Sequence, residues 1–173
     1  MKKKILVLLF SMLLMLVGCS SQSNVLSEHL SDVLLNDNAL YMYIAPGYDS
    51  IKQEDGQWIY DDTVYFFFES KDDANTFKEK YNIDTVMTFY TTYGDVEVWC
   101  IYTDLRIDFA EDATIESGLY SLYNDETKKH EDVKDLNELN QVCDSLDDLW
   151  FADVEVNEKQ EITKLTASKI SFY

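Results

Sequence analysis

The feature that most constrains the fold of this 173-residue chain is an alternation of apolar and polar side chains, repeated in short runs between turn residues. In the clearest run, Leu105, Ile107 and Phe109 alternate with Arg106 and Asp108. This period of two is typical of a β-strand with one face buried. Most connections between such runs are too short for a parallel crossover, so the sequence predicts a mainly antiparallel sheet.

Turn residues divide the runs into separate strands. The pair Asp55-Gly56 tolerates positive φ angles and predicts a tight hairpin, while Asp61-Asp62, Tyr93-Gly94-Asp95 and residues 124–129 predict further turns. The run of Phe66, Phe67 and Phe68 is expected in the core rather than at a binding surface. The predicted strands are residues 39–44 (covered on both faces), 50–53, 57–60, 63–69, 85–92, 96–103, 105–109, 115–123, 152–156 and 162–173.

Three segments have the 3.6-residue period of amphipathic helices, over residues 24–36, 71–81 and 132–149. Ser70 is a good N-cap for the second of them, because its hydroxyl can accept hydrogen bonds from the first-turn amides. The predicted fold class is therefore α+β, with a single domain in which about three amphipathic helices pack against a mainly antiparallel β-sheet.

The first nineteen residues follow a different pattern. Lys2, Lys3 and Lys4 precede residues 5–17, which are apolar apart from one serine. As a helix, this run of about 13 residues would span roughly 20 Å, which is too short for the ~30 Å hydrocarbon core of a bilayer. The pattern favours a cleavable export signal over a permanent transmembrane anchor.

The signal ends in Leu16-Val17-Gly18-Cys19, which resembles the lipobox of bacterial prolipoproteins. In that family a diacylglyceryl group, with acyl chains such as palmitate, is attached to the cysteine sulfur, and the chain is cut directly before the cysteine. The resemblance implies a signal peptide over residues 1–18, a short tether over residues 19–24 that begins with lipidated Cys19, and a folded domain over residues 25–173. It predicts a protein held by its lipid to the extracytoplasmic face of the cell membrane. The alternatives are an ordinary secretory signal or a short uncleaved anchor, in either of which Cys19 has no role.

The charge of the chain is strongly negative, with 33 acidic and 14 basic residues and a formal charge of −19. Loss of the leader removes three lysines and no acid, so the remaining 155 residues would carry about −22. We expect no binding to nucleic acid and repulsion from anionic lipid headgroups, which leaves the lipid on Cys19 as the membrane contact. The acidic surface could serve solubility, or it could attract cations or a basic protein or peptide.

Two cysteines and two histidines remain as candidates for redox or metal chemistry. Cys100 lies in a strand-like run and Cys143 on the apolar stripe of a helix, so we expect two buried thiols, with one disulfide as the alternative. His29 lies beside the stripe of the first helix, and His130 falls in a predicted turn. A zinc site would need both histidines together with distant carboxylates.

The sequence assigns no catalytic, cofactor-binding or metal-binding residue. It contains neither a Gly-x-Ser-x-Gly elbow nor a glycine-rich phosphate loop. Several carboxylate groups offer oxygen ligands for weak calcium binding, although none has the spacing of a calcium loop. They are Asp61-Asp62, Asp72-Asp73, Asp108-Glu111-Asp112 and Asp147-Asp148.

These observations lead to one functional hypothesis and two alternatives. The hypothesis is a membrane-anchored extracytoplasmic lipoprotein whose domain is a non-enzymatic binding module of unknown ligand. The first alternative is an acidic inhibitor or immunity-type lipoprotein that captures a basic protein, with Asp61 and Asp62 beside Tyr60 as candidates for the contact. The second alternative is a carboxylate-dependent envelope hydrolase whose catalytic acids the sequence does not identify. Enzymatic activity is left open, with a non-enzymatic role favoured.

Overall fold

A long ladder between two strands forms the centre of the fold. The computed structural model describes residues 22–85, 87–90, 97–116, 118–143 and 151–168. In it, β3 (Gln57–Phe68) pairs antiparallel with β5 (Glu97–Ile115) over ten residue pairs, from Ile59 opposite Asp108 to Phe68 opposite Trp99.

Other strands pair with the outer edges of this ladder and close it into a ring. β3 pairs on its other edge with β1 (Tyr41–Ile44) and β2 (Ile51–Glu54). β5 pairs on its other edge with β4 (Met87–Tyr90) and β9 (Ile162–Ala167). β8 (Ala152–Val156) lies between β1 and β9. The strands β3, β1, β8, β9 and β5 thus form a closed ring, which leaves few unpaired edge groups. The pairing of β5 with β9 is parallel and the other pairings in this sheet are antiparallel, so the sheet is mixed but mainly antiparallel.

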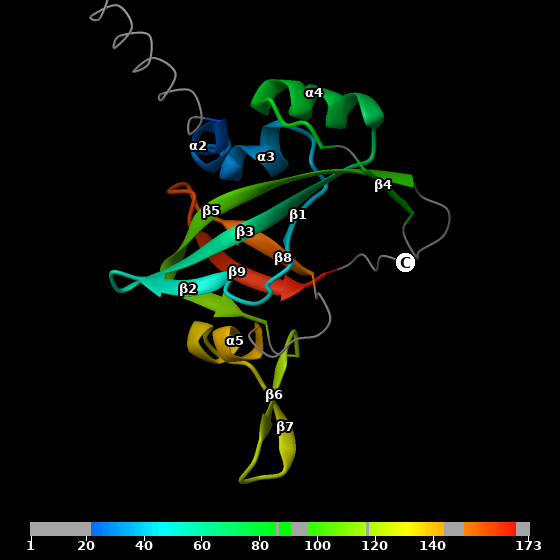
Figure 1. The fold of residues 1–173 in the computed structure, drawn as a ribbon. Helices are drawn as coiled ribbons and strands as arrows, with labels where there is room; N and C mark the ends of the chain where they lie inside the picture. Colours follow the sequence, from blue (N-terminus) through cyan, green and yellow to red (C-terminus); the bar gives the residue numbers. More distant parts are fainter. Residues whose placement is uncertain (1–21, 86, 91–96, 117, 144–150, 169–173) are drawn as a thin grey trace, which may run out of the picture.

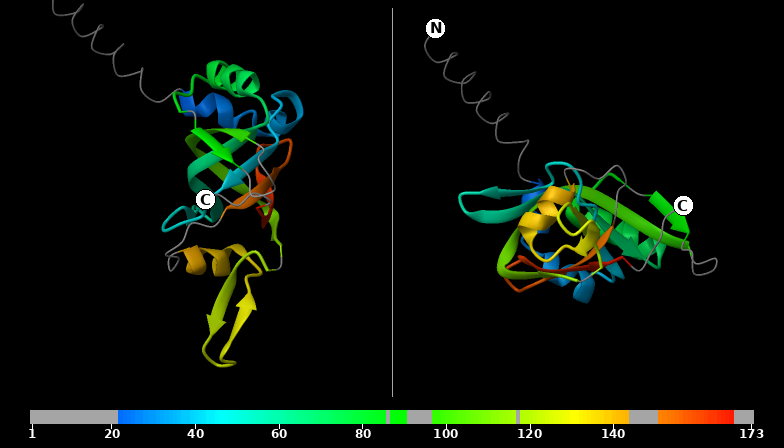
Figure 2. Two further views of the ribbon diagram at one scale, coloured as in Figure 1. Left: turned by 90° about the vertical axis from the view of Figure 1, so that its right-hand side faces the viewer. Right: turned by 90° about the horizontal axis from the view of Figure 1, so that it is seen from below.

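Helices and a hairpin lie at opposite ends of the molecule. Figures 1 and 2 show α2 (Gln22–Ser27), α3 (Leu30–Asn36) and α4 (Lys71–Tyr81) at one end and the strands in the middle. At the other end are α5 (Leu136–Cys143) and a separate hairpin formed by β6 (Ser121–Asn124) and β7 (Lys129–Asp132). The predicted α+β class is confirmed.

The core between the sheet and α4 is aromatic. The ring of Phe77 lies 5.0 Å from that of Phe66, 5.1 Å from that of Phe68 and 4.8 Å from that of Tyr81, measured between centroids. Phe67 points to the opposite face of the sheet and packs with Tyr43 at 5.3 Å. The prediction that the phenylalanine run belongs to the core is confirmed, as is the prediction that β1 is covered on both faces.

Two local predictions are confirmed in detail. The Ser70 hydroxyl accepts hydrogen bonds from the amides of Asp72 at 3.1 Å and Asp73 at 3.3 Å, which caps α4. Asp55 and Gly56 have φ angles of 50° and 87°, as a tight hairpin between β2 and β3 requires.

The predicted turn at Asp61-Asp62 is wrong, because β3 runs through both residues. Asp61 stands opposite Arg106 and accepts a hydrogen bond from Lys52 at 2.8 Å, while Asp62 accepts one from the amide of Thr63 at 2.7 Å. Opposite charges across the ladder offset the low β-propensity of aspartate.

β5 also joins segments that were predicted to be separate strands. It continues through Asp104, whose carboxylate accepts a hydrogen bond from the Thr63 hydroxyl at 2.7 Å, and reaches Ile115. Leu105, Ile107 and Phe109 are buried as predicted. The predicted strand over residues 115–123 is wrong in part, since the chain leaves this sheet and begins the β6–β7 hairpin at Ser121.

The first predicted helix is divided into α2 and α3 at His29, which has the non-helical angles φ −133° and ψ 18°. The side chain of Gln160, in the turn between β8 and β9, accepts a hydrogen bond from the Ser31 amide at 2.8 Å and donates one to the Ser31 hydroxyl at 3.0 Å. A residue distant in sequence therefore caps α3, which no local pattern predicts.

The last predicted helix begins later than residue 132. Asp132 still belongs to β7 and pairs with Ser121 of β6. Asp135, directly before α5, accepts a hydrogen bond on its carboxylate from the backbone amide of Glu138 at 2.9 Å. The predicted turn Tyr93-Gly94-Asp95 and the ends of the last helix and last strand lie outside the described residues.

We predict that Phe77→Ala destabilises the domain by about 3–5 kcal/mol, because it empties the aromatic contact between α4 and the sheet. Tyr48→Ala is the matched control, since that ring is 79% exposed and its loss should cost less than about 0.5 kcal/mol. Urea unfolding followed by circular dichroism measures both changes, and equal losses would contradict the assigned core.

Candidate functional site

The predicted lipidation site, Cys19, lies outside the described residues, as does the rest of the Leu16-Val17-Gly18-Cys19 motif. Among the residues that the structure describes, no helix is both long and apolar enough to cross a membrane.

Tyr60 does not contribute to the predicted contact at Asp61 and Asp62. The Tyr60 ring is buried, and its hydroxyl donates a hydrogen bond to the carbonyl of Thr63 at 2.7 Å. Burial raises the pKa of Tyr60, and the nearby charge of Asp62 raises it further. The Tyr60 ring therefore adds no contact area beside these carboxylates, while Asp61 is exposed and accepts a hydrogen bond from Lys52. A contact through the two carboxylates stays a prediction.

The carboxylates proposed as calcium ligands remain dispersed. Within the described part of the chain, no three His, Cys, Asp or Glu side chains come together as a metal site. Asp73 accepts a hydrogen bond from Asn38 at 3.0 Å, and the pair Asp147-Asp148 lies outside the described residues.

The two histidines lie at opposite ends of the molecule (Figure 1). His29, before α3, lies 3.5 Å from the carboxylate of Asp32 and is exposed. His130 is part of β7 and not of a turn as predicted; its ring packs edge-on to Tyr123 at 5.4 Å. The structure does not bring the histidines together.

Cys100 and Cys143 are both buried thiols, as expected. Cys100 belongs to the cluster on the outer face of the sheet, with Tyr43 and Phe67, whereas Cys143 belongs to the main core. Burial raises the pKa of Cys100 to about 12.

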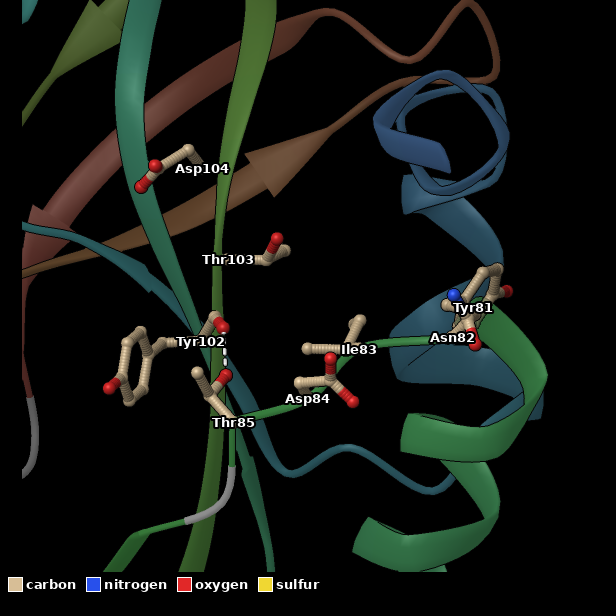
Figure 3. Close-up of a pocket in the computed structure, with 8 residues that line it drawn as sticks. All are labelled: Tyr81, Asn82, Ile83, Asp84, Thr85, Tyr102, Thr103 and Asp104. Carbon is tan, nitrogen blue, oxygen red and sulfur yellow. Dashed lines mark hydrogen bonds between the residues drawn. The ribbon is translucent and has the colours of Figure 1, made fainter. Parts of the chain in front are cut away.

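A first hollow, of about 290 Å³, lies between the end of α4 and β5 (Figure 3). Asn82 ends α4 in the left-handed conformation, and the Thr85 hydroxyl donates a hydrogen bond to the carbonyl of Tyr102. Figure 3 shows the ring of Tyr102 pointing away from Ile83 and Asp84. Figure 3 shows the carboxylates of Asp84 and Asp104 at different places along the hollow, so they do not converge on a common point.

A polar cluster beside this hollow joins the helices. Asp37, with a side chain only 10% exposed, lies 2.6 Å from the ammonium group of Lys80 and accepts a hydrogen bond from the Tyr81 hydroxyl at 2.8 Å. The hydrogen bond to Asp37 raises the pKa of Lys80. This cluster fixes the end of α3 against α4.

A second hollow, of about 390 Å³, lies between the β6–β7 hairpin and α5, and we call it the hairpin groove. Leu122 and Tyr123 contribute apolar surface, and Tyr123 is 53% exposed. Five carboxylates and one ammonium group line the groove: Asp125, Glu126, Glu131, Asp132, Glu138 and Lys134.

Hydrogen bonds position two of the groove carboxylates, one on each wall. Glu131, on β7, accepts hydrogen bonds from the Asn124 amide group and the Thr127 hydroxyl, both at 3.0 Å. Glu138, on α5, accepts one from the Lys134 amide at 2.8 Å. Acceptors fixed in this way suit the donor groups of a cationic ligand. The excess of carboxylates gives the groove a negative potential.

The predicted turn at 124–129 is confirmed for residues 125–128, but sequence reasoning missed this groove because it did not predict the strand β7 that follows the turn and includes His130. The density of acids between Asp125 and Glu138 is visible in the sequence. Only the pairing of β6 with β7 brings Asp125, Glu126, Glu131 and Asp132 opposite Glu138 on α5.

Comparison of the chain with known protein families, with curated proteins and with solved structures gives no match.

The burial of Cys100 and Cys143 predicts that neither thiol reacts in the folded protein, whether or not Cys19 carries a lipid. In a Cys19→Ala background, a thiol reagent at pH 8 should leave Cys100 and Cys143 unmodified in the folded protein and label both after unfolding. Mass spectrometry counts the labels. Rapid labelling of the folded chain would contradict their burial.

Folding raises the Cys100 pKa above its unfolded value of about 8.5, so the thiol's contribution to stability is complete below that pH and is lost as the pH rises toward 12. The stability difference between the parent and Cys100→Ala should therefore fall over that range.

Proposed function

We propose that this chain is a lipid-anchored lipoprotein of the extracytoplasmic face of a bacterial cell membrane, and that its domain is a non-enzymatic binding module. The observation that carries the anchor is the leader: three lysines, a short apolar run and the lipobox-like Leu16-Val17-Gly18-Cys19. Two acyl chains on Cys19 would hold the domain to the bilayer far more durably than one chain.

A second proposal concerns the ligand, and the hairpin groove favours it. We infer that the groove binds a basic protein or peptide. Its carboxylates outnumber its single lysine, and Glu131 and Glu138 are held in place as acceptors. The exposed ring of Tyr123 supplies rigid apolar contact area beside them. Charge would speed the encounter with a basic partner and set its orientation.

The proposed envelope hydrolase would use the same groove, because Glu131 and Glu138 lie on opposite walls. Glycoside hydrolysis requires an acid and a second carboxylate on either side of the scissile bond. Release of product from cell-wall glycan distinguishes the two proposals. A hydrolase would release product, and Glu131→Gln or Glu138→Gln would abolish that release. A binding module would release no product before or after these changes.

Replacement of the lipidated cysteine tests the anchor. Cys19→Ala should move the protein from the membrane fraction to the soluble or unprocessed pool, because no sulfur remains to carry the lipid. Cys100→Ala is the matched control and should stay in the membrane fraction. Cell fractionation and intact-mass measurement follow both variants. Processing and membrane retention of Cys19→Ala like the parent would remove the anchor proposal.

Capture of basic proteins at two salt concentrations tests the groove. The protein, held in detergent micelles, should retain basic envelope proteins at about 20 mM salt and lose most of them by about 150 mM, since the screening length is about 10 Å at 0.1 M. Neutralising three groove acids should abolish capture, whereas neutralising three acids at the helix end should not. The groove set is Asp125→Asn, Glu126→Gln and Asp132→Asn, and the control set is Glu69→Gln, Asp72→Asn and Glu79→Gln.

The control set has the same change in net charge, so a loss of capture confined to the groove set identifies the site. Equal losses in both sets would show a general charge effect, and no basic protein captured at 20 mM salt would remove the proposal.

A further inference from the structure

The exposed apolar side chains of the described surface are concentrated at its N-terminal end. Six large apolar or tyrosine side chains are exposed among the described residues, and four of them lie between Val25 and Leu40. Leu35, the most exposed of the six, is 80% accessible. Single exposed apolar residues are common on protein surfaces, but a concentration in one short segment calls for an explanation. The four residues are Val25, Leu34, Leu35 and Leu40.

These exposed side chains do not belong to the face by which α2 and α3 pack on the core. Leu26, Leu30 and Val33 already supply that face and are at most 2% exposed. The bonds between Ser31 and Gln160 fix the start of α3, and those between Asp37 and α4 fix its end. Because α3 is held at both ends, Leu35 cannot turn into the core.

The segment begins directly after the proposed lipid. Only two residues separate Cys19 from Gln22, where α2 begins. Even fully extended, that link spans roughly 10 Å. A diacylglyceryl group on Cys19 would therefore hold α2 within reach of the headgroup region of the bilayer.

We propose that the exposed side of α2, of α3 and of the segment between α3 and β1 rests on the lipid surface, with Val25, Leu34, Leu35 and Leu40 inserted into the interface as a second membrane contact beside the lipid. This inference rests on the proposed anchor at Cys19. The contact is apolar and not electrostatic, because anionic headgroups repel the carboxylates of Glu28 and Asp32 on this segment. It goes beyond the expectation from the sequence, in which the lipid alone touches the membrane.

This contact gives the domain a defined orientation. Figures 1 and 2 show α2 and α3 at the end of the molecule opposite to the β6–β7 hairpin. With α2 and α3 on the bilayer, the hairpin groove faces away from the membrane. An acidic groove in that position meets partners that arrive from outside the cell membrane.

Depth-dependent quenching in vesicles tests the proposal on the full, lipidated protein. Leu35→Cys and, as the control at the hairpin, Glu126→Cys are each labelled with the fluorophore NBD and reconstituted into phosphatidylcholine vesicles with or without nitroxide-labelled lipid. The lipid on Cys19 blocks its sulfur, and Cys100 and Cys143 are buried, so the label reaches the introduced thiol. We expect the nitroxide to quench the label at position 35 at least threefold more than the label at position 126.

A second variant tests whether the apolar side chains make the contact. With the label at Val25→Cys, the added changes Leu34→Ser and Leu35→Ser should lower the quenching, because the link to Cys19 keeps α2 near the headgroups but does not insert it. Unchanged quenching would contradict a role for these side chains, and circular dichroism confirms that the domain remains folded.

The outcomes separate this inference from the anchor. Protein that floats with the vesicles but shows equal quenching at positions 35 and 126 keeps the anchor and overturns the docking face. Protein that does not float overturns both. The NBD emission at position 35 could instead shift to the blue without nitroxide quenching, and the shift could disappear when the protein is diluted. That result would show that a second copy of the chain covers this face, and it would also overturn the proposal.

Discussion

The antiparallel ladder between β3 and β5 is the interaction on which the rest of the structure depends. Its ten residue pairs supply the longest continuous set of backbone hydrogen bonds in the described sheet, and each strand offers its other edge to two partners. The ring closes only because β1, β8 and β9 connect the far edge of β3 to the far edge of β5. Phe66 and Phe68 receive α4 on one face of this ladder, and Phe67 packs on the other. Loss of the ladder would therefore separate the core, the helices and the sheet at once.

The ladder also separates two surfaces with different properties. One end of the molecule has the helices that follow the proposed lipid, with apolar side chains exposed on α2 and α3; the other end has the hairpin groove and its carboxylates. Because a rigid sheet lies between the two ends, the orientation of α2 and α3 at the membrane would also fix the orientation of the hairpin groove. A lipoprotein anchored in this way would present an acidic groove outward at a fixed distance from the bilayer, which favours the encounter with basic partners through charge.

The sequence allowed prediction where a few neighbouring residues decide the structure. The Ser70 cap and the Asp55-Gly56 hairpin belong to this class, because the atoms that stabilise them lie within three residues of one another. Prediction failed where a distant residue decides. The Asp61-Asp62 pair suggests a turn until Lys52 and Arg106 lie beside it, and the helix over residues 24–36 appears continuous until Gln160 caps Ser31. The groove was missed for the same reason, since its acids become neighbours only when β6 pairs with β7.

Native-state hydrogen exchange, read residue by residue, tests the central role of the ladder most directly. We predict that the hydrogen-bonded amides shared by β3 and β5, between Ile59–Phe68 and Trp99–Asp108, exchange slowest and only through global unfolding. The amides of β6 and β7 should exchange orders of magnitude faster through local opening, since a two-stranded hairpin is marginally stable by itself. If the β3–β5 amides exchanged as fast as the hairpin amides, or faster than the amides between β1 and β8, the ladder would not be the most stable part of the fold.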